Sequence, residues 1–399
     1  MDLTLPYLIL TLILGILSGT ITGLIPGIHI NLIAAIIFTS SLLTLLPLEI
    51  LLTFIISMAI THTFIDFIPS IFFGAPDEDT GLSSLPGHKF LLKGLGHEAL
   101  KLTVLGSTIA IISLTFIIPL FIFGISKIYP FISRMMGWFL IWISIFLISN
   151  EKESKVNSTI IFLLAGFLGL ASLNLPLNQP LLPLLTGLFG SSTLIYSIRQ
   201  KSIIPEQKIG RMYISKKEII RPTIATTLVS PICALFPGLG SSQAAIIGSE
   251  ISGRLNKEQF LILLGSINTL IMAISFITLI VLQKSRTGAA NALSQIGVGE
   301  SQLTLIILIL LISSAFAIPL TLFLSKSLAR KIHKINYPKV SIIILIFLTS
   351  LILFSTGFLG FLTFIISTIL GLVSIELNVR RGFLMGALLI PTTIFYLPF

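Results

Sequence analysis

Residues 303–324 read LTLIILILLISSAFAIPLTLFL, a run in which no side chain carries a charge. An apolar run of about 18 or more residues is long enough to cross a bilayer as one α-helix. Comparable runs occur at residues 3–25, 102–123 and 340–354, so apolar segments recur from one end of the chain to the other. We therefore predict an all-α integral membrane protein that crosses the membrane many times.

The composition supports this prediction. Of the 399 residues, 54% are hydrophobic and only 10% are charged, whereas about 25% are charged in a typical soluble domain. The formal net charge of +10 does not predict nucleic-acid binding, because the basic residues lie in short segments between apolar runs, as the positive-inside rule expects. The single cysteine, Cys233, excludes an internal disulfide and a thiolate metal cluster. The N-terminus has no basic region before the first apolar run, which we expect to stay in the membrane.

Three landmarks occur in the same order in both halves of the chain, which predicts an internal duplication. Their offsets are 211, 206 and 207 positions. We predict a first membrane repeat over residues 1–200, a basic cytoplasmic linker over 201–218 and a second repeat over 219–399, all in one membrane domain. The landmarks, each with its counterpart, are residues 23–29 (GLIPGIH) and 234–240 (ALFPGLG), 61–63 (THT) and 267–269 (INT), and 79–81 (DTG) and 286–288 (RTG).

The charge pattern predicts how the repeats are oriented. The segments 199–221 and 326–339 are rich in lysine and arginine, so we expect both in the cytoplasm. Counting crossings from these two segments gives each half five net crossings and one hairpin, and an odd count inverts the second half. The result is two inverted repeats with about 10 transmembrane helices and two Pro-Gly-tipped hairpins, a plan typical of secondary transporters. The alternative is an ordinary helix bundle with a decayed duplication.

The hairpin tips are candidate binding sites. Proline removes a backbone donor and glycine permits unusual dihedral angles, so the pairs Pro26-Gly27 and Pro237-Gly238 are expected to interrupt helices. Broken helices inside a membrane must be covered by protein or water, and their N-terminal ends attract anions. The alternative is two tight turns between short helices. Polar or small residues that follow the tips complete this candidate set: His29, Asn31, Gly240, Ser241 and Ser242.

The segment after each hairpin carries polar side chains in the middle of an apolar run. Hydroxyl and amide groups there could coordinate a cation or a carboxylate, or could instead bond their own helix or a neighbouring one. His62 and Asp66 are four residues apart and so share a helix face. Ionisable residues inside a membrane suggest function, so this pair is predicted to relay a proton or bind a cation, with a satisfied ion pair as the alternative. The other candidates are Thr61, Ser266, Asn268 and Thr269.

Residues 74–81 (GAPDEDTG) place three consecutive acids directly after an apolar run, whereas the counterpart at 283–288 (QKSRTG) is basic. The two segments could meet across a pseudo-twofold axis. Alternatively the acids bind a cation while Arg286 binds the substrate anion, since a guanidinium pairs bidentately with a carboxylate. A third reading is two solvated loops on opposite sides of the membrane. The candidate residues are Pro76, Asp77, Asp79, Thr80, Arg286 and Thr287.

Other polar residues suggest no chemistry. His88, His97 and His333 stand near lysines and are predicted to lie on the surface, and residues 151–155 are predicted to form a solvated turn. The sequence has no zinc-protease motif, phosphate-binding loop, nucleophile elbow or cysteine pair. We therefore predict no catalytic residues, no metal, no cofactor and no enzymatic activity.

Several of these segments together resemble a known family. Pro26-Gly27 after the first helix, and the segments 68–76 (IPSIFFGAP), 85–94 (LPGHKFLLKG) and 235–240 (LFPGLG), are similar to the large permease subunit of tripartite tricarboxylate transporters, the TctA family, in its shorter archaeal branch. The resemblance implies an ion-gradient-driven carrier of organic anions, in which an elevator motion is one option. It points to Pro26, Gly27, Pro76, Pro237, Gly238 and Gly240. The chain departs from the family pattern at Asp77–Asp79, normally small and neutral, and at His29, normally glycine.

The function predicted from these features is secondary active transport of a small, carboxylate-bearing organic anion across the cytoplasmic membrane. Alternating access would be coupled to Na⁺ or H⁺. The expected partners are membrane lipids, the organic anion, a small membrane subunit, an extracytoplasmic binding protein and a second copy of the chain. Two alternatives remain open: a metal-dependent membrane enzyme acting on a lipid headgroup through Asp77, Glu78 and Asp79, and a scaffold or channel that does not carry a solute.

Overall fold

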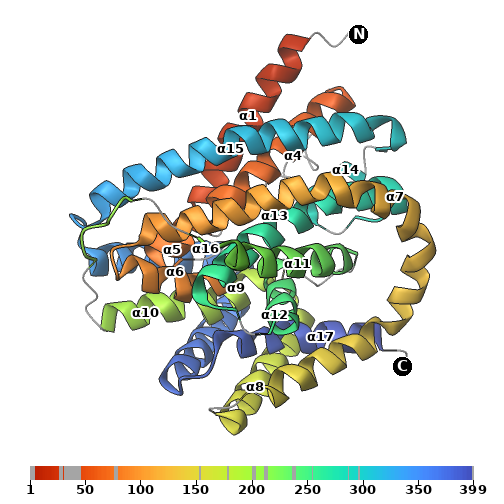
Figure 1. The fold of residues 1–399 in the computed structure, drawn as a ribbon. Helices are drawn as coiled ribbons and strands as arrows, with labels where there is room; N and C mark the ends of the chain where they lie inside the picture. The colour runs from red at the N-terminus through yellow and green to blue at the C-terminus, as the bar shows by residue number, and fades with distance from the viewer. Residues whose placement is uncertain are drawn as a thin grey trace.

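The computed structural model is built from α-helices that pack into two bundles (Figure 1). Across the part of the chain that it describes there is no β-strand, and nine helices are long and apolar enough to cross a membrane. The predicted class, a multi-pass all-α membrane protein, is therefore confirmed. The described residues are 5–26, 30, 46–75, 80–151, 154–177, 179–199, 204–210, 214–235, 240–253, 255–285, 287–294 and 297–397.

The large bundle contains the helices that carry the candidate residues. The helix α13 runs through its centre, and 94% of its most apolar window is buried inside the protein. Two short helical turns, η1 (Gly81–Ser83) and η3 (Glu300–Gln302), belong to its connections. Its helices are α1 (Leu5–Leu24), α4 (Leu48–Ile65), α5 (Phe67–Phe73), α6 (Ser84–Leu91), the first part of α7 (Gly96–Ser149), α11 (Lys216–Cys233), α12 (Ser241–Ile251), α13 (Lys257–Leu282), α14 (Gly288–Ser294) and α15 (Leu303–Ile332).

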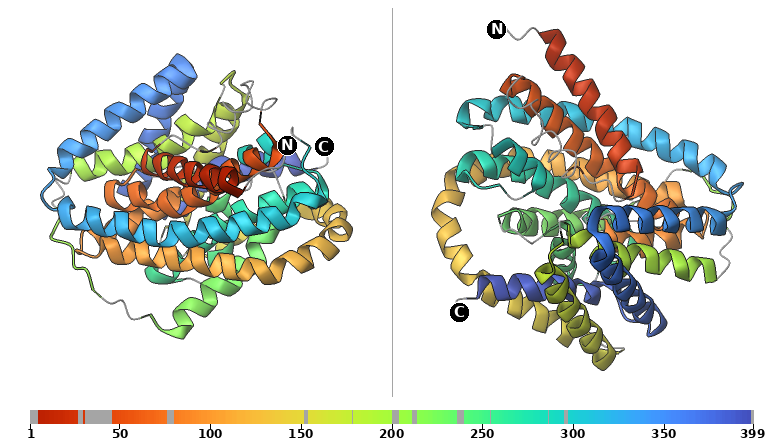
Figure 2. Two further views of the ribbon diagram at one scale, coloured as in Figure 1. Left: turned by 90° about the horizontal axis from the view of Figure 1, so that it is seen from above. Right: turned by 180° about the vertical axis from the view of Figure 1, so that it is seen from behind.

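The small bundle is joined to the large one by α7, which curves from one to the other (Figure 2). The apolar run predicted at residues 102–123 is only part of α7, which continues through Pro119 and Pro130. Prolines inside a helix are a usual cause of such bending. Besides the end of α7, the members are α8 (Lys155–Asn174), α9 (Leu181–Leu185), the π-helical turn η2 (Thr186–Ser191), α10 (Ser192–Arg199), α16 (Tyr337–Glu376), η4 (Arg381–Met385) and α17 (Gly386–Tyr396).

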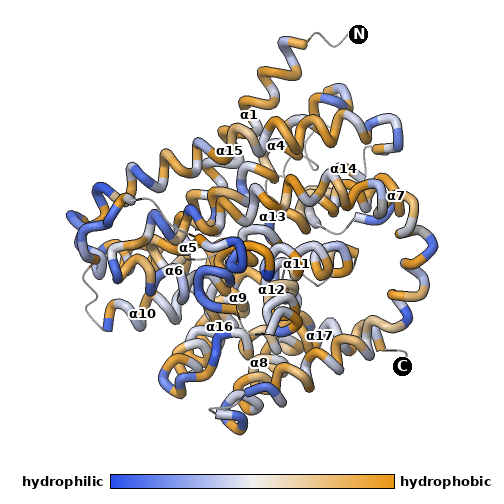
Figure 3. The backbone as a smooth tube through the Cα atoms, viewed as in Figure 1, coloured by the Kyte–Doolittle hydropathy of each residue, from blue (hydrophilic) through white to orange (hydrophobic). Residues whose placement is uncertain are grey.

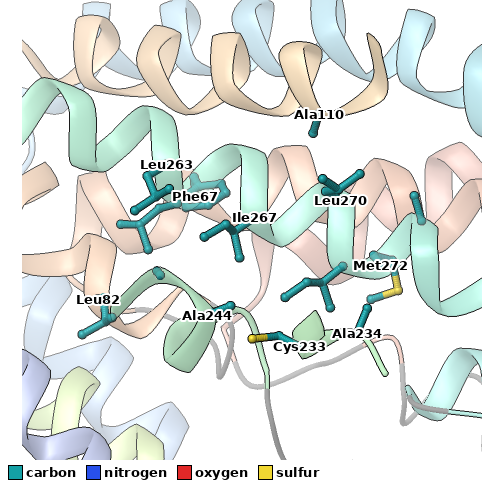
Figure 4. Close-up of a cluster of buried hydrophobic side chains, with 14 of the residues drawn as sticks. Phe67, Leu82, Ala110, Cys233, Ala234, Ala244, Leu263, Ile267, Leu270 and Met272 are labelled. Carbon is teal, nitrogen blue, oxygen red and sulfur yellow. The ribbon is translucent and has the colours of Figure 1, made fainter. Parts of the chain in front are cut away.

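The apolar core of the large bundle surrounds α13. Leu263, Ile267 and Leu270 of α13 lie among side chains from neighbouring elements, including Phe67 of α5 and Ala244 of α12 (Figure 4). Most positions along the helices are hydrophobic, and hydrophilic residues gather towards helix ends and connections (Figure 3). Only 17% of the most apolar window of α16 is buried, so this helix exposes its apolar side chains to the surroundings, as a lipid-facing helix does.

Three glycines bring α1 close to α4. Gly15, Gly19 and Gly23 are spaced four apart on one face, and a Cβ added at these positions would collide with Ser57, Met58 and Ile65 of α4, respectively. Small residues at this spacing allow membrane helices to approach closely. The contacts run in the same order along both helices, so α1 and α4 are parallel.

The two halves of the chain exchange packing partners. In the large bundle, α7 packs along α13 while α15 packs along α4; in the small bundle, α17 packs on α8 while α16 packs on η2 and α10. Two glycines repeat this relationship. Gly169 of α8 lies against the carbonyl of Ala387, and Gly371 of α16 lies against the carbonyl of Leu188. The two glycines are 202 positions apart and their two partners are 199 positions apart. The contact of Gly169 with Ala387 therefore corresponds to the contact of Gly371 with Leu188, with the two halves exchanged.

Candidate functional site

The helix that contains His62 is interrupted at Asp66. Pro69 has no amide hydrogen to donate to the carbonyl of Ile65, and its ring crowds that carbonyl, so α4 ends and α5 begins on either side of Asp66. The backbone amide of Asp66 still donates to the carbonyl of His62, at 2.9 Å. Asp66 itself keeps helical dihedral angles (φ −58°, ψ −19°), so the irregularity is limited to one residue and places a carboxylate in the bundle interior.

Asp66 belongs to a buried polar network that joins three helices. Its Oδ2 accepts a hydrogen bond from Nδ2 of Asn268 in α13, at 2.8 Å. Oδ1 of Asn268 accepts one from the hydroxyl of Ser241, the first residue of α12, at 3.1 Å. The three residues are between 1% and 3% exposed. An ionisable group so deep in a membrane protein is costly unless its partners are provided, so this network is the strongest candidate site in the described part of the chain.

His62 extends the network towards α1. Its Nδ1 lies 3.0 Å from the hydroxyl of Thr22, and its Nε2 lies 4.0 Å from Oδ2 of Asp66. The prediction that His62 and Asp66 share a face is therefore confirmed. Chemically, an imidazole this close to a carboxylate can pass or store a proton, and the carboxylate with nearby hydroxyls can hold a small cation.

Hydroxyl groups line the same interior region. The hydroxyls of Thr63 and Thr269 lie 3.2 Å apart, and those of Thr226 and Ser266 lie 2.5 Å apart. Thr63 and Ser266 also donate to carbonyls of their own helices, which is the structural role that the sequence left open. The hydroxyl of Thr61 is fully buried and has no hydrogen-bond partner among the described residues.

The helix α12, which follows the predicted tip of the second hairpin, reaches this network. Gly240 is the residue before the helix, and its amide donates to the side chain of Gln243 at 3.1 Å. Ser241, Ser242 and Gln243 are all buried. The structure thus brings Ser241 to Asn268 and Asp66, and keeps Ser242 buried one residue further along. In the first half, Pro26 is half-buried and follows the end of α1.

The two described loop candidates, Thr80 and Thr287, contact residues outside the network. The carbonyl of Thr80 lies 3.3 Å from the hydroxyl of Ser70 in α5, whereas the hydroxyl of Thr287 lies 3.1 Å from that of Ser275 in α13. Thr80 is fully buried, so it does not belong to a solvated loop. Nine predicted site residues lie outside the described residues: Gly27, His29, Asn31, Pro76, Asp77, Asp79, Pro237, Gly238 and Arg286.

Two predictions about surface residues are wrong. His88 and His97 are buried, because α10, α15 and α16 pack over the segments that carry them. His88 stacks on Tyr337 with ring centroids 5.4 Å apart, and burial lowers the pKa of His88 to about 4. Glu151 is also buried rather than solvated, and it pairs with Arg380 at 2.6 Å.

The sequence reasoning overlooked Thr22 and Thr226, whose hydroxyls contact His62 and Ser266. A signal was present, since each is a polar residue in a helix that pairs with a candidate segment, but threonine is common in membrane helices and usually bonds its own backbone. Among the described residues, no group of three or more histidine, cysteine, aspartate or glutamate side chains could hold a metal ion.

Comparison with known proteins identifies the family. The model of the tripartite tricarboxylate transporter TctA family matches residues 9–386. An uncharacterized protein of Methanocaldococcus jannaschii is 30% identical over 400 residues, which cover 98% of this chain and 99% of that protein. No solved structure matches the chain.

Proposed function

The chain belongs to the TctA family of tripartite tricarboxylate transporters, and on that premise we propose that it carries a small carboxylate-bearing anion across the cell membrane by alternating access. Membership confirms the prediction of a transport protein rather than an enzyme, because the family consists of transporters. The chemical class of the anion, the coupling ion and the alternating-access mechanism are proposed here.

One observation carries the proposal: the buried network of Asp66, Asn268 and Ser241 connects the two halves of the chain. Transporters with duplicated halves bind substrate and coupling ions near the membrane midplane, where interrupted helices of both halves meet. Here the interrupted helix α4–α5 comes from the first half, and α12 and α13 come from the second. A buried polar site contributes little net stability to an apolar fold, so a functional role explains this network better than a structural role does.

We propose that the halves are inverted repeats, and two observations support this. The first is the exchange of packing partners, including the contacts of Gly169 and Gly371. The second is the direction of the counterpart helices. The last carbonyl of α5, that of Phe73, bonds Tyr337, which stacks on His88 of α6. Lys89 of α6 and Lys257 at the start of α13 line one cavity. The end of α5 and the beginning of α13 therefore lie at the same end of the molecule.

The coupling ion would act at His62 and Asp66. A proton could occupy either group and move between them as the surroundings change. A sodium ion would use the carboxylate together with hydroxyl and amide oxygens, such as those of Thr61 and Asn268. Both options use the same residues, so the imposed gradient that drives uptake distinguishes proton from sodium coupling. His62→Gln tests only whether the imidazole takes part, because the carboxylate of Asp66 remains.

The family name implies that such a permease works within a three-part system. We propose that a small membrane subunit packs against the apolar outer helices and that an extracytoplasmic binding protein delivers the anion. A homodimer is a further proposal. The weakly buried helix α16 offers an apolar face for lipid or for a membrane partner.

The experiment that tests the function is uptake by proteoliposomes. Purified protein is reconstituted and given labelled di- and tricarboxylates under imposed Na⁺ or proton gradients. We expect saturable uptake that collapses when one of the two gradients is dissipated. Uptake that is independent of both gradients, or that does not saturate, would contradict a coupled carrier and favour a channel. Uptake that appears only when a binding protein is added would support the three-part assembly.

A further inference from the structure

A cavity of about 440 Å³ lies between the large and small bundles, away from the Asp66 network. Its volume lies in the range of small-molecule sites, about 300–1,000 Å³. The large bundle contributes Lys89, Ser249 and Lys257, and the small bundle contributes Leu147, Arg380 and Phe383. The cavity therefore has walls from both bundles, at the basic end of the molecule that we predict to face the cytoplasm.

The arginines of this cavity already have partners. Arg380 pairs with Glu151 at 2.6 Å and with Glu250 at 3.4 Å, so two carboxylates neutralise its charge. Arg381 donates to the carbonyls of Leu188 and Phe189, at 2.7 and 3.0 Å, so its guanidinium is directed into the small bundle. Carboxylates neutralise Arg380, and the guanidinium of Arg381 is held by carbonyl and hydroxyl oxygens inside the small bundle.

Lys89 and Lys257 are different. Within the described part of the chain, neither side chain has a carboxylate within 4 Å, and none of the ion pairs there includes Lys89 or Lys257. Both side chains line the same cavity, and partial burial together with the positive charge of Lys257 lowers the pKa of Lys89. Lys257 also stands in the first turn of α13, where the aligned peptide dipoles add positive potential. Two neighbouring ammonium groups without a counterion favour a ligand with at least two negative charges.

We propose that Lys89 and Lys257 make this cavity a second anion site. It binds a small di- or tricarboxylate on the cytoplasmic side of the membrane, opposite to the side from which the proposed carrier takes the anion up. The site goes beyond the proposed function, since it uses none of the residues of the Asp66 network. Both lysines are exposed to solvent, and water weakens exposed ionic contacts, so we expect binding in the millimolar range rather than tight capture. Because its walls belong to both bundles, a bound anion would favour the arrangement of the bundles seen in this structure.

A labelling experiment tests the site without any transport. Ser249→Cys places a thiol in the cavity wall, and the native Cys233 is buried. The rate of reaction with neutral N-ethylmaleimide is measured for the full chain in detergent, with citrate and with potassium chloride at the same ionic strength. We expect citrate, but not chloride, to slow labelling at least threefold. In Lys89→Gln/Lys257→Gln the slowing should disappear, and in Lys89→Arg/Lys257→Arg it should return.

A matched control is Lys93→Gln/Lys334→Gln, which removes two exposed lysines that do not line the cavity. This variant should keep the full effect of citrate. Equal rates with citrate and chloride, or slowing that persists without Lys89 and Lys257, would overturn the proposal. The result is independent of the uptake assay, so a protein without measurable transport can still show the site, and an active carrier can still lack it.

Discussion

The carboxylate of Asp66 accepts a 2.8 Å hydrogen bond from the side-chain amide of Asn268, 202 positions later in the chain. Asn268 is the counterpart of His62 in the predicted duplication, and His62 itself lies beside Asp66. The carboxylate therefore stands between two residues that occupy corresponding places in the two halves. This arrangement means that a change in the charge of Asp66 acts on both halves at once.

Asp66→Asn should abolish coupled transport. The substitution keeps the size of the side chain but removes the charge that a proton or cation would neutralise. We expect gradient-driven uptake in proteoliposomes to fall at least tenfold, with the protein still folded. Glu49→Gln is the matched control, because Glu49 lies in the first turn of the same helix and outside the network. Normal uptake by Asp66→Asn would exclude a role for this carboxylate in coupling.

Asn268→Ala should destabilise the protein. It removes the donor to Asp66 and the acceptor of Ser241 together, and a buried polar group left without its partner costs about 1–3 kcal/mol. The measurement is the thermal unfolding midpoint in detergent. Asn174→Ala serves as the control, since Asn174 is exposed and bonds only its own helix carbonyl. If both variants unfold at the same temperature, the network contributes little to stability.

Gly169→Ala and Gly371→Ala should be similarly destabilising. In each case the added methyl group would meet a backbone carbonyl that cannot move aside like a side chain, and such overpacking costs about 1–3 kcal/mol. Unfolding midpoints in detergent give the comparison. Gly210→Ala is the control, because a Cβ there would meet nothing within 4 Å. A large effect at only one of the two glycines would argue against corresponding roles in the two halves.

Acid should weaken the protein through His88. Burial lowers the pKa of His88 from 6.5 to about 4, so the unfolded chain takes up a proton more readily than the folded one. The contribution of neutral His88 is complete above pH 6.5 and is lost as the pH falls towards 4. The loss is roughly 3–4 kcal/mol, at about 1.4 kcal/mol per pKa unit over the interval from 6.5 to about 4.

The measurement for His88 is the unfolding midpoint in detergent at pH 7.5 and pH 4.5. His88→Phe keeps an aromatic ring opposite Tyr337 but cannot titrate, so its midpoint should fall less over this interval. The comparison concerns the pH dependence and not the absolute stability, which also changes when the contact with Ser197 is lost. Equal pH dependence in the two proteins would show that other groups cause the acid effect.

Much of the architecture could be predicted from the sequence because membrane helices are local features. The apolar run at 303–324 lies inside α15, and the apolar run at 340–354 lies inside α16. The shared face of His62 and Asp66 follows from helix geometry alone. The continuity of α7 was missed, since a proline inside an apolar run is compatible with either a bend or a break.

The amino-acid sequence by itself determined which segments are apolar helices and that polar residues stand in the middle of α4 and α13. These properties depend on residues within a few turns of one another, and the preference of each residue for lipid or water adds along the segment. Only the tertiary structure decided that Asp66 meets Asn268, that Ser241 reaches the same network and that His88 and Glu151 are buried. Those contacts join residues far apart in the chain, and the close packing of whole helices, which no local pattern specifies, selects among many alternative neighbours.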